Sequence, residues 1–98
     1  KTAILVSSGF GAGFSTWNST FPNIEQDGTL AQMVLDEKSV SEMVAYLEDT
    51  YKDNEAYVCT LGVQDLEVEW LPEGTAYIIE EYDGSESIRT TSDLTGVA

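Results

Sequence analysis

Carboxylates are the side chains in this sequence best suited to do chemistry. Glu67 and Glu69 alternate with apolar residues in the segment LEVEW, and more acidic residues follow in EEYDGSE. A pair of carboxylates can run acid-base catalysis or bind Mg²⁺ or Ca²⁺. The segment DGSE lacks the ordered ligand ladder of a calcium loop and is typical of an ordinary turn, so we predict no metal site. The acidic candidates are Glu67, Glu69, Glu80, Glu81, Asp83 and Glu86.

The residue types that most enzymes need are missing. The chain has no histidine, which removes the usual general base, the imidazole of a catalytic triad and the commonest transition-metal ligand. Cys59 is the only cysteine, so it forms no intrachain disulfide and no thiolate zinc site. Serine hydroxyls are plentiful, but they lack a histidine or a convincing lysine partner. We predict no catalytic residue, no cofactor and no enzymatic activity, and the lone cysteine favours a reducing cytoplasm.

The charge balance indicates what kind of partner to expect. The 98 residues include 18 acidic and four basic side chains, which gives a formal net charge of -14. Such a field repels nucleic acid and anionic membrane surfaces, and it attracts basic proteins. The apolar runs are only a few residues long, too short for a membrane span. We therefore expect no direct binding to nucleic acid or membrane, and a basic protein or nucleoprotein complex as the partner.

The spacing of Glu67 and Glu69 suggests a specific use for the charge. Alternate residues of a strand repeat at about 7 Å, which is similar to the separation of successive phosphates along a nucleic-acid strand. Several such rows would imitate a phosphate backbone. The competing interpretation is a soluble sheet whose charged edge prevents aggregation, and the sequence leaves both open.

A glycine-rich loop offers a second candidate site. Gly9, Gly11 and Gly13 follow an apolar run, and glycines after a strand can cradle an anion with backbone N–H groups. With Trp17, Asn18 and Trp70, this loop would form a pocket for a nucleotide-like ligand. However, the spacing is not that of a known phosphate loop, and no lysine or arginine lies nearby. We favour a structural role, in which the glycines let a turn pass close to four aromatic residues on one side of a helical segment, namely Phe10, Phe14, Trp17 and Phe21.

Hydrophobic periodicity predicts the elements that position these residues. A continuous apolar run predicts a central strand buried on both faces, and alternating patterns predict the other strands. Turn signals at 71–74 and 83–84 predict that the last three strands form a meander that begins with a hairpin. The predicted strands span 2–7, 56–61, 66–70, 75–81 and 87–91, and the second of these would place Cys59 in or near the core.

Two helices are expected between the first two strands. Thr29 is the predicted N-cap of a helix over 30–38. Ser39 and Glu42 have the spacing of a capping box, followed by a helix that runs to about Tyr51. The order of elements predicts one α+β domain over residues 1–98, with a mainly antiparallel sheet of four to five strands and two helices packed on one face. An uncapped strand edge allows either a monomer or a homodimer.

The segments SSGFGAGFSTWN and VEWLPEGTAYIIEEYDGSESI together resemble a family of small uncharacterised acidic proteins encoded by bacteriophages and prophages. The match covers about a third of the chain and implies a phage setting in the cytoplasm of a host bacterium. With the charge, it leads us to expect an anti-CRISPR-like inhibitor of a host defence complex. The resemblance marks two sets of residues as site candidates: Gly9, Gly11, Gly13, Trp17 and Asn18 in the first segment, and Glu69, Trp70, Tyr82, Asp83 and Glu86 in the second.

Overall fold

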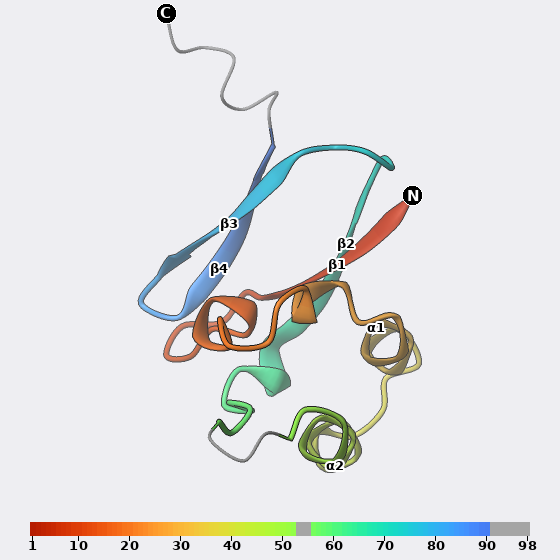
Figure 1. Ribbon diagram of the computed structural model, residues 1–98, viewed down its shortest axis with the longest axis vertical. Coiled ribbons are helices and arrows are strands. Elements are labelled where there is room, and N and C mark those ends of the chain that lie inside the picture. Colours follow the sequence, from red (N-terminus) through yellow and green to blue (C-terminus); the bar gives the residue numbers. More distant parts are fainter. Residues whose placement is uncertain (53–55, 91–98) are drawn as a thin grey trace, which may run out of the picture.

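The computed structural model describes residues 1–52 and 56–90, and this part of the chain folds into two helices and four antiparallel strands. The strands form two separate two-stranded sheets, and both helices lie near the same end of the molecule (Figure 1). The predicted α+β class, with antiparallel pairing and two helices, is confirmed. The four described strands do not form one continuous sheet.

The first sheet pairs β1 (Thr2–Ser7) with β2 (Leu66–Leu71), so that Leu5 lies opposite Val68. Side chains alternate along a strand, so Ile4 and Val6 point away from the face that carries Leu5. All three are buried, which confirms that both faces of β1 are covered. The strand is not central, however, because β2 is its only ladder partner in the described part of the chain.

The second sheet is a hairpin of β3 (Tyr77–Tyr82) and β4 (Ser85–Thr90). Its two-residue turn has positive φ at both positions, 51° at Asp83 and 88° at Gly84, as the right-handed twist of a hairpin favours. The turn predicted from Asp83-Gly84 is confirmed. Thr91, predicted as the end of the last strand, lies outside the described residues.

The predicted hairpin of 66–70 with 75–81 is wrong. The turn itself is present, because the Thr75 N–H donates to the Pro72 carbonyl at 3.1 Å and Gly74 has a φ of 81°. It leads from the first sheet into the second, since β2 already pairs with β1. That pairing places Leu66 and Val68 against the helices, so burial of apolar side chains decides the partner of β2.

The two helices begin at carboxylate and hydroxyl caps. Helix α1 (Gly28–Leu35) is capped by Asp27, whose Oδ1 accepts from the Leu30 N–H at 2.8 Å, so the predicted cap at Thr29 is wrong. Helix α2 (Val40–Thr50) begins as predicted, with the Ser39 hydroxyl accepting from the Glu42 N–H at 3.2 Å. The helices cover the Leu5 face of the first sheet, and the core there contains Leu5, Phe14, Ile24, Leu30, Ala31, Met43, Leu47, Val63 and Leu66.

Two predicted segments are irregular. The loop after β1 contains only a short 3-10 helix, Ser15–Trp17, so its aromatic residues do not share one side of a helix. Phe14 is fully buried there, whereas Phe10 is 71% exposed. Residues 56–61 do not form the predicted strand, because the Asn18 amide makes the backbone hydrogen bonds that a neighbouring strand would otherwise make. It accepts from the N–H of half-buried Cys59 at 2.6 Å and donates to that residue's carbonyl at 3.0 Å.

Candidate functional site

A buried carboxylate organises the loop that follows β1. Glu86 of β4 is only 4% exposed. Its Oε1 accepts from the Ser7 N–H at 2.9 Å, and its Oε2 accepts from the N–H groups of Phe14 at 2.8 Å and Thr16 at 3.0 Å. The Thr16 hydroxyl donates to the same oxygen at 2.5 Å. Four donors converge on this side chain, so Glu86, predicted as a partner contact, is unavailable at the surface.

The glycine-rich loop does present converging N–H groups, but their acceptor is Glu86. An added Cβ on Gly13 would lie 3.0 Å from Oε2 of this carboxylate. Gly11 has a φ of 106°, a conformation that favours glycine, and its N–H donates to the Asp83 carbonyl at 2.7 Å. The glycines therefore let the loop wrap around β4 and its turn. The N–H groups that a nucleotide phosphate would need already donate hydrogen bonds within the fold.

The other members of the predicted ligand loop do not converge on one pocket. Gly9 packs against Asp65, since an added Cβ would lie 2.2 Å from its Oδ2. Asn18 is buried, and its amide is used by the main chain. Trp17 lies beside β3, whereas Trp70 pairs across to the start of β1. The two tryptophans belong to different parts of the fold, which disfavours a shared nucleotide pocket.

The acidic candidates of β2 lie at the surface. Glu67 and Glu69 are exposed and share one face of their strand, about 7 Å apart along it. The ion pairs described for the chain join the Lys1 amino group to Glu73, Lys52 to Asp49, and Arg89 to Glu80. Glu67 and Glu69 take part in none of these three pairs. They present uncompensated negative charge on a regular element.

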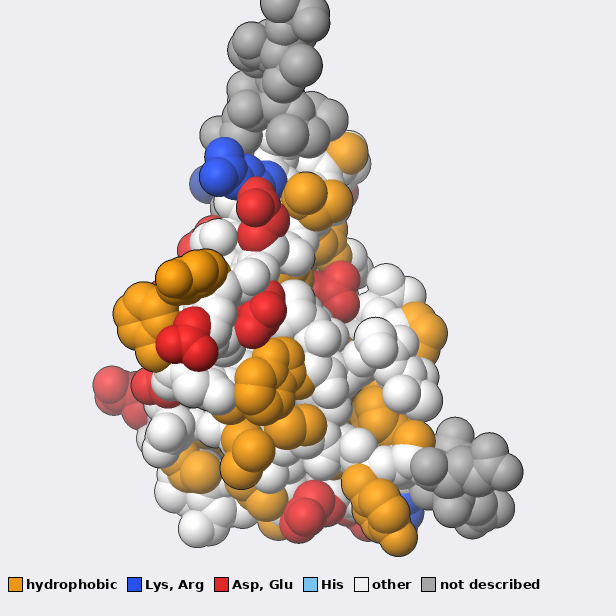
Figure 2. Space-filling model, turned by 90° about the vertical axis from the view of Figure 1, so that its left-hand side faces the viewer, with side chains coloured by type: hydrophobic (Ala, Val, Ile, Leu, Met, Phe, Trp, Pro, Cys, Tyr) orange, Lys and Arg blue, Asp and Glu red, His pale blue; other side chains and the backbone are white. Residues whose placement is uncertain are grey.

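The acidic candidates of the β3–β4 hairpin differ from one another. Glu80 forms an ion pair with Arg89 across the hairpin. Glu81 is exposed and accepts from the Gly84 N–H at 2.8 Å and from Trp17 Nε1 at 3.4 Å. Asp83 is exposed in the turn. Acidic and apolar side chains interleave on the face that lies to the left in Figure 1 (Figure 2). The six candidates thus do not form one row, because they belong to two sheets and one of them is buried.

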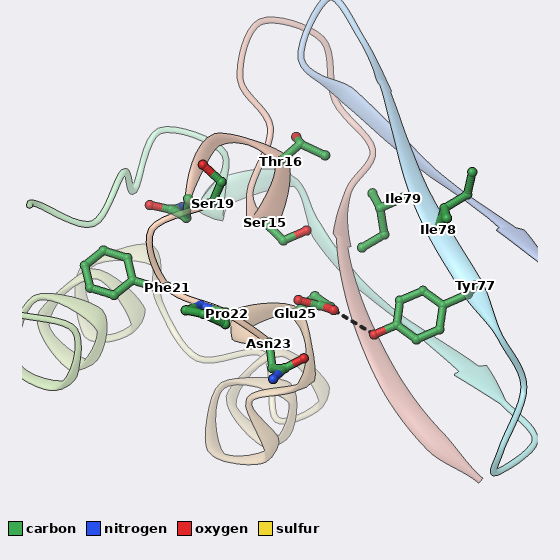
Figure 3. A pocket seen from close by; sticks show the side chains of 11 residues that line it. Ser15, Thr16, Ser19, Phe21, Pro22, Asn23, Glu25, Tyr77, Ile78 and Ile79 are labelled. Carbon is green, nitrogen blue, oxygen red and sulfur yellow. Dashed lines mark hydrogen bonds between the residues drawn. The ribbon is translucent and has the colours of Figure 1, made fainter.

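A groove of about 390 Å³ lies between β3 and the segment of two short 3-10 helices, Ser15–Trp17 and Ile24–Gln26 (Figure 3). Glu25 lies in the middle of this groove, between Ser15 and Asn23, and the Tyr77 ring reaches toward it from β3. The Tyr77 hydroxyl donates to Glu25 Oε2 at 2.6 Å and accepts from Gln26 Nε2 at 2.7 Å. Burial and the hydrogen bond to Glu25 raise the pKa of Tyr77.

Sequence reasoning missed this groove. Glu25 lies in a segment predicted as loop, and Tyr77 is one aromatic residue of a predicted strand. They are 52 residues apart, and neither belongs to a motif that would join them. The only available signal was the isolated placement of Glu25 and Asp27 in an otherwise neutral stretch.

Neither a metal cluster nor a membrane-spanning helix is found in residues 1–52 and 56–90. This part of the chain holds no group of three His, Cys, Asp or Glu side chains arranged to bind a metal ion. None of its helices is long and apolar enough to cross a membrane.

Comparisons with known proteins give no relative: no family model, no curated protein and no solved structure matches the chain. The resemblance to phage proteins therefore stays a prediction.

Proposed function

We propose that this protein is a stoichiometric inhibitor that binds the basic, nucleic-acid-binding surface of a bacterial defence complex, as an anti-CRISPR protein encoded by a phage and acting in the host cytoplasm. The observation that carries the proposal is the exposed pair Glu67 and Glu69 on β2, outside the described ion pairs of a chain with a net charge of -14. Their spacing of about 7 Å imitates successive phosphates.

The acidic residues contribute unequally to this proposed interface. Glu67 and Glu69 form the main contact, and the exposed carboxylates of Glu81 and Asp83 form a second one at the hairpin turn. Glu80 contributes less, because Arg89 already compensates its charge. Close, desolvated charge pairs at such interfaces couple by roughly 1.5 to 7 kcal/mol, whereas pairs at the rim mainly speed association.

The test begins in cells that carry a CRISPR system directed against a phage. Expression of the protein should restore plaque formation, and purified protein should block DNA binding by the purified effector complex with an endpoint near one protein per complex. A variant with Glu67→Lys, Glu69→Lys and Glu81→Lys should lose both effects. Inhibition by the natural protein should weaken as salt is raised, because charge contacts carry the binding.

A charge-matched control separates a defined surface from net charge. Asp36→Lys, Glu37→Lys and Glu48→Lys change the net charge by the same amount at exposed positions in and after the helices. This control variant should inhibit nearly as well as the natural protein. Equal losses in the two variants, or full inhibition by both, would refute the proposed mimicry by β2 and the hairpin turn.

A further inference from the structure

The groove between β3 and the two short 3-10 helices has a consistent chemical character. Its walls combine apolar surface from Ile79 and Phe21 with polar side chains, and Glu25 supplies a carboxylate at its centre (Figure 3). No lysine or arginine is among the residues that line it. Hydroxyl groups of Ser15 and Ser19 add further hydrogen-bond acceptors.

The Glu25 carboxylate is positioned but not neutralised. Its Oε2 accepts from the Tyr77 hydroxyl, and the hydrogen bonds described for Glu25 do not use Oε1. The Tyr77 hydroxyl is itself held by Gln26 Nε2 at 2.7 Å, so the carboxylate is oriented from two elements. None of the described ion pairs includes Glu25. The groove thus holds a carboxylate that is held in place through Oε2, while its Oε1 takes part in none of the described hydrogen bonds.

We propose that this groove binds the guanidinium group of an arginine side chain presented by a basic protein partner. A guanidinium has five N–H donors and no acceptor, which matches a lining of carboxylate, hydroxyl and amide oxygens. Its planar face can stack on the Tyr77 ring, and its apolar stem can lie against Ile79. This inference rests on the proposed function, since it names a residue type that the basic partner inserts.

The field of the whole chain favours a cation over other ligands of similar size. A net charge of -14 raises the local concentration of cations and lowers that of anions such as phosphate. A neutral polar ligand would gain the hydrogen bonds but not the charge interaction with Glu25. The distinction between a guanidinium and a neutral group of the same shape is therefore the sharpest test.

The experiment is a titration of the ¹⁵N-labelled full chain, followed by NMR, with Nα-acetyl-arginine methylamide and with its citrulline analogue. Citrulline replaces the guanidinium by a neutral urea of nearly the same shape. The arginine probe should bind with a dissociation constant on the order of millimolar and shift the amide signals of Ser15, Glu25 and Tyr77. The citrulline probe should bind about fivefold more weakly.

Variants then test the role of the carboxylate. Glu25→Gln keeps an acceptor for the Tyr77 hydroxyl and should weaken the arginine probe by about fivefold, to the level of citrulline. Glu48→Gln, an exposed position on α2, changes the net charge equally and should leave the affinity unchanged. Equal binding of the two probes, or equal effects of the two variants, would overturn the proposal. Because the probes need no protein partner, this result is independent of whether the protein inhibits a defence complex.

Discussion

Replacement of the Glu86 carboxylate by an amide should destabilise the fold. Its oxygens accept from Ser7, Phe14 and Thr16. In Glu86→Gln, one oxygen becomes an NH₂ group that faces N–H donors, and the charge that strengthens the bonds is lost. We expect the free energy of unfolding to fall by about 2 to 3 kcal/mol, measured by urea denaturation.

The control for this change lies directly across the hairpin. Glu81 is the register partner of Glu86 but is exposed, so Glu81→Gln removes the same charge from the same sheet. Its free energy of unfolding should stay within about 0.5 kcal/mol of the natural value. Similar losses for the two variants would mean that the buried hydrogen bonds of Glu86 do not set its contribution to stability.

The chemistry of the glycine loop was predictable, but its acceptor was not. Glycines after a strand indicate a backbone that can present N–H groups to an anion. The anion comes from residue 86, 72 residues after Phe14, and nothing in the local sequence joins the two. In the sequence, Glu86 lies in the same kind of alternating strand pattern as the exposed glutamates of β2. Its burial therefore follows only from the packing of the hairpin on the loop.

The hairpin turn is held against the glycine loop by close backbone packing. An added Cβ on Gly84 would lie 2.2 Å from the Ala12 nitrogen, whereas one on Gly74 would meet no atom within 4 Å. Both glycines have positive φ, 88° and 81°. Gly74→Ala should therefore cost about 1 to 2 kcal/mol of stability from backbone strain alone.

Gly84→Ala should cost more, because strain and a backbone clash combine, and we expect a loss of more than about 3 kcal/mol. Thermal or urea unfolding of the two variants gives the comparison directly. If their losses were equal, the turn would not be packed against the loop as described.

The start of α1 is tied to α2 through one carboxylate. Asp27 accepts from the hydroxyl groups of Tyr46 and Tyr51 as well as capping α1. Burial and the hydrogen bond to Asp27 raise the pKa of both tyrosines above the ordinary 10.0. The folded protein holds these protons more tightly than the unfolded chain, so their contribution is complete below pH 10 and is lost as the pH rises through the folded-state pKa.

We therefore expect the urea midpoint to fall between about pH 10 and pH 11, with little change from about pH 8 to pH 10. Tyr51→Phe removes one of the three tyrosines whose pKa is raised and should make the fall shallower. The same slope in this variant would show that Tyr51 does not contribute to the alkaline loss.

Elements with strong local signals were predictable from the sequence. The Ser39 cap, three residues before Glu42, and the Asp83-Gly84 turn are local patterns, and both are confirmed. The pairing of β2 was not predictable, because the turn after it indicates a reversal of the chain but not the partner strand. Residues 56–61 have a strand-like pattern, yet the Asn18 amide takes the hydrogen bonds that a strand would make.

Charge repulsion should limit the stability of the chain as a whole. With 18 acidic and four basic residues, the compact state brings like charges together. Raising NaCl from about 10 mM to about 500 mM shortens the screening length several-fold. We expect Tm to rise by about 4 to 8 °C, which corresponds to about 1 kcal/mol in a domain of this size.

The surface pair on β2 allows a direct check of this electrostatic effect. A variant with Glu67→Lys and Glu69→Lys carries less net charge and should show a smaller rise of Tm with salt. A Tm of the natural protein that does not change with salt would mean that its charges are too far apart to repel one another appreciably.

The link between Ser7 and Glu86 also governs the order of events during synthesis on the ribosome. The two residues are 79 positions apart, so the N–H groups after β1 emerge long before their acceptor exists. Until then the Phe14 segment cannot form its hydrogen bond to Glu86, and its apolar surface stays accessible to chaperones. The loop after β1 is translated well before Glu86 and is thus among the last parts of this domain to reach its final structure.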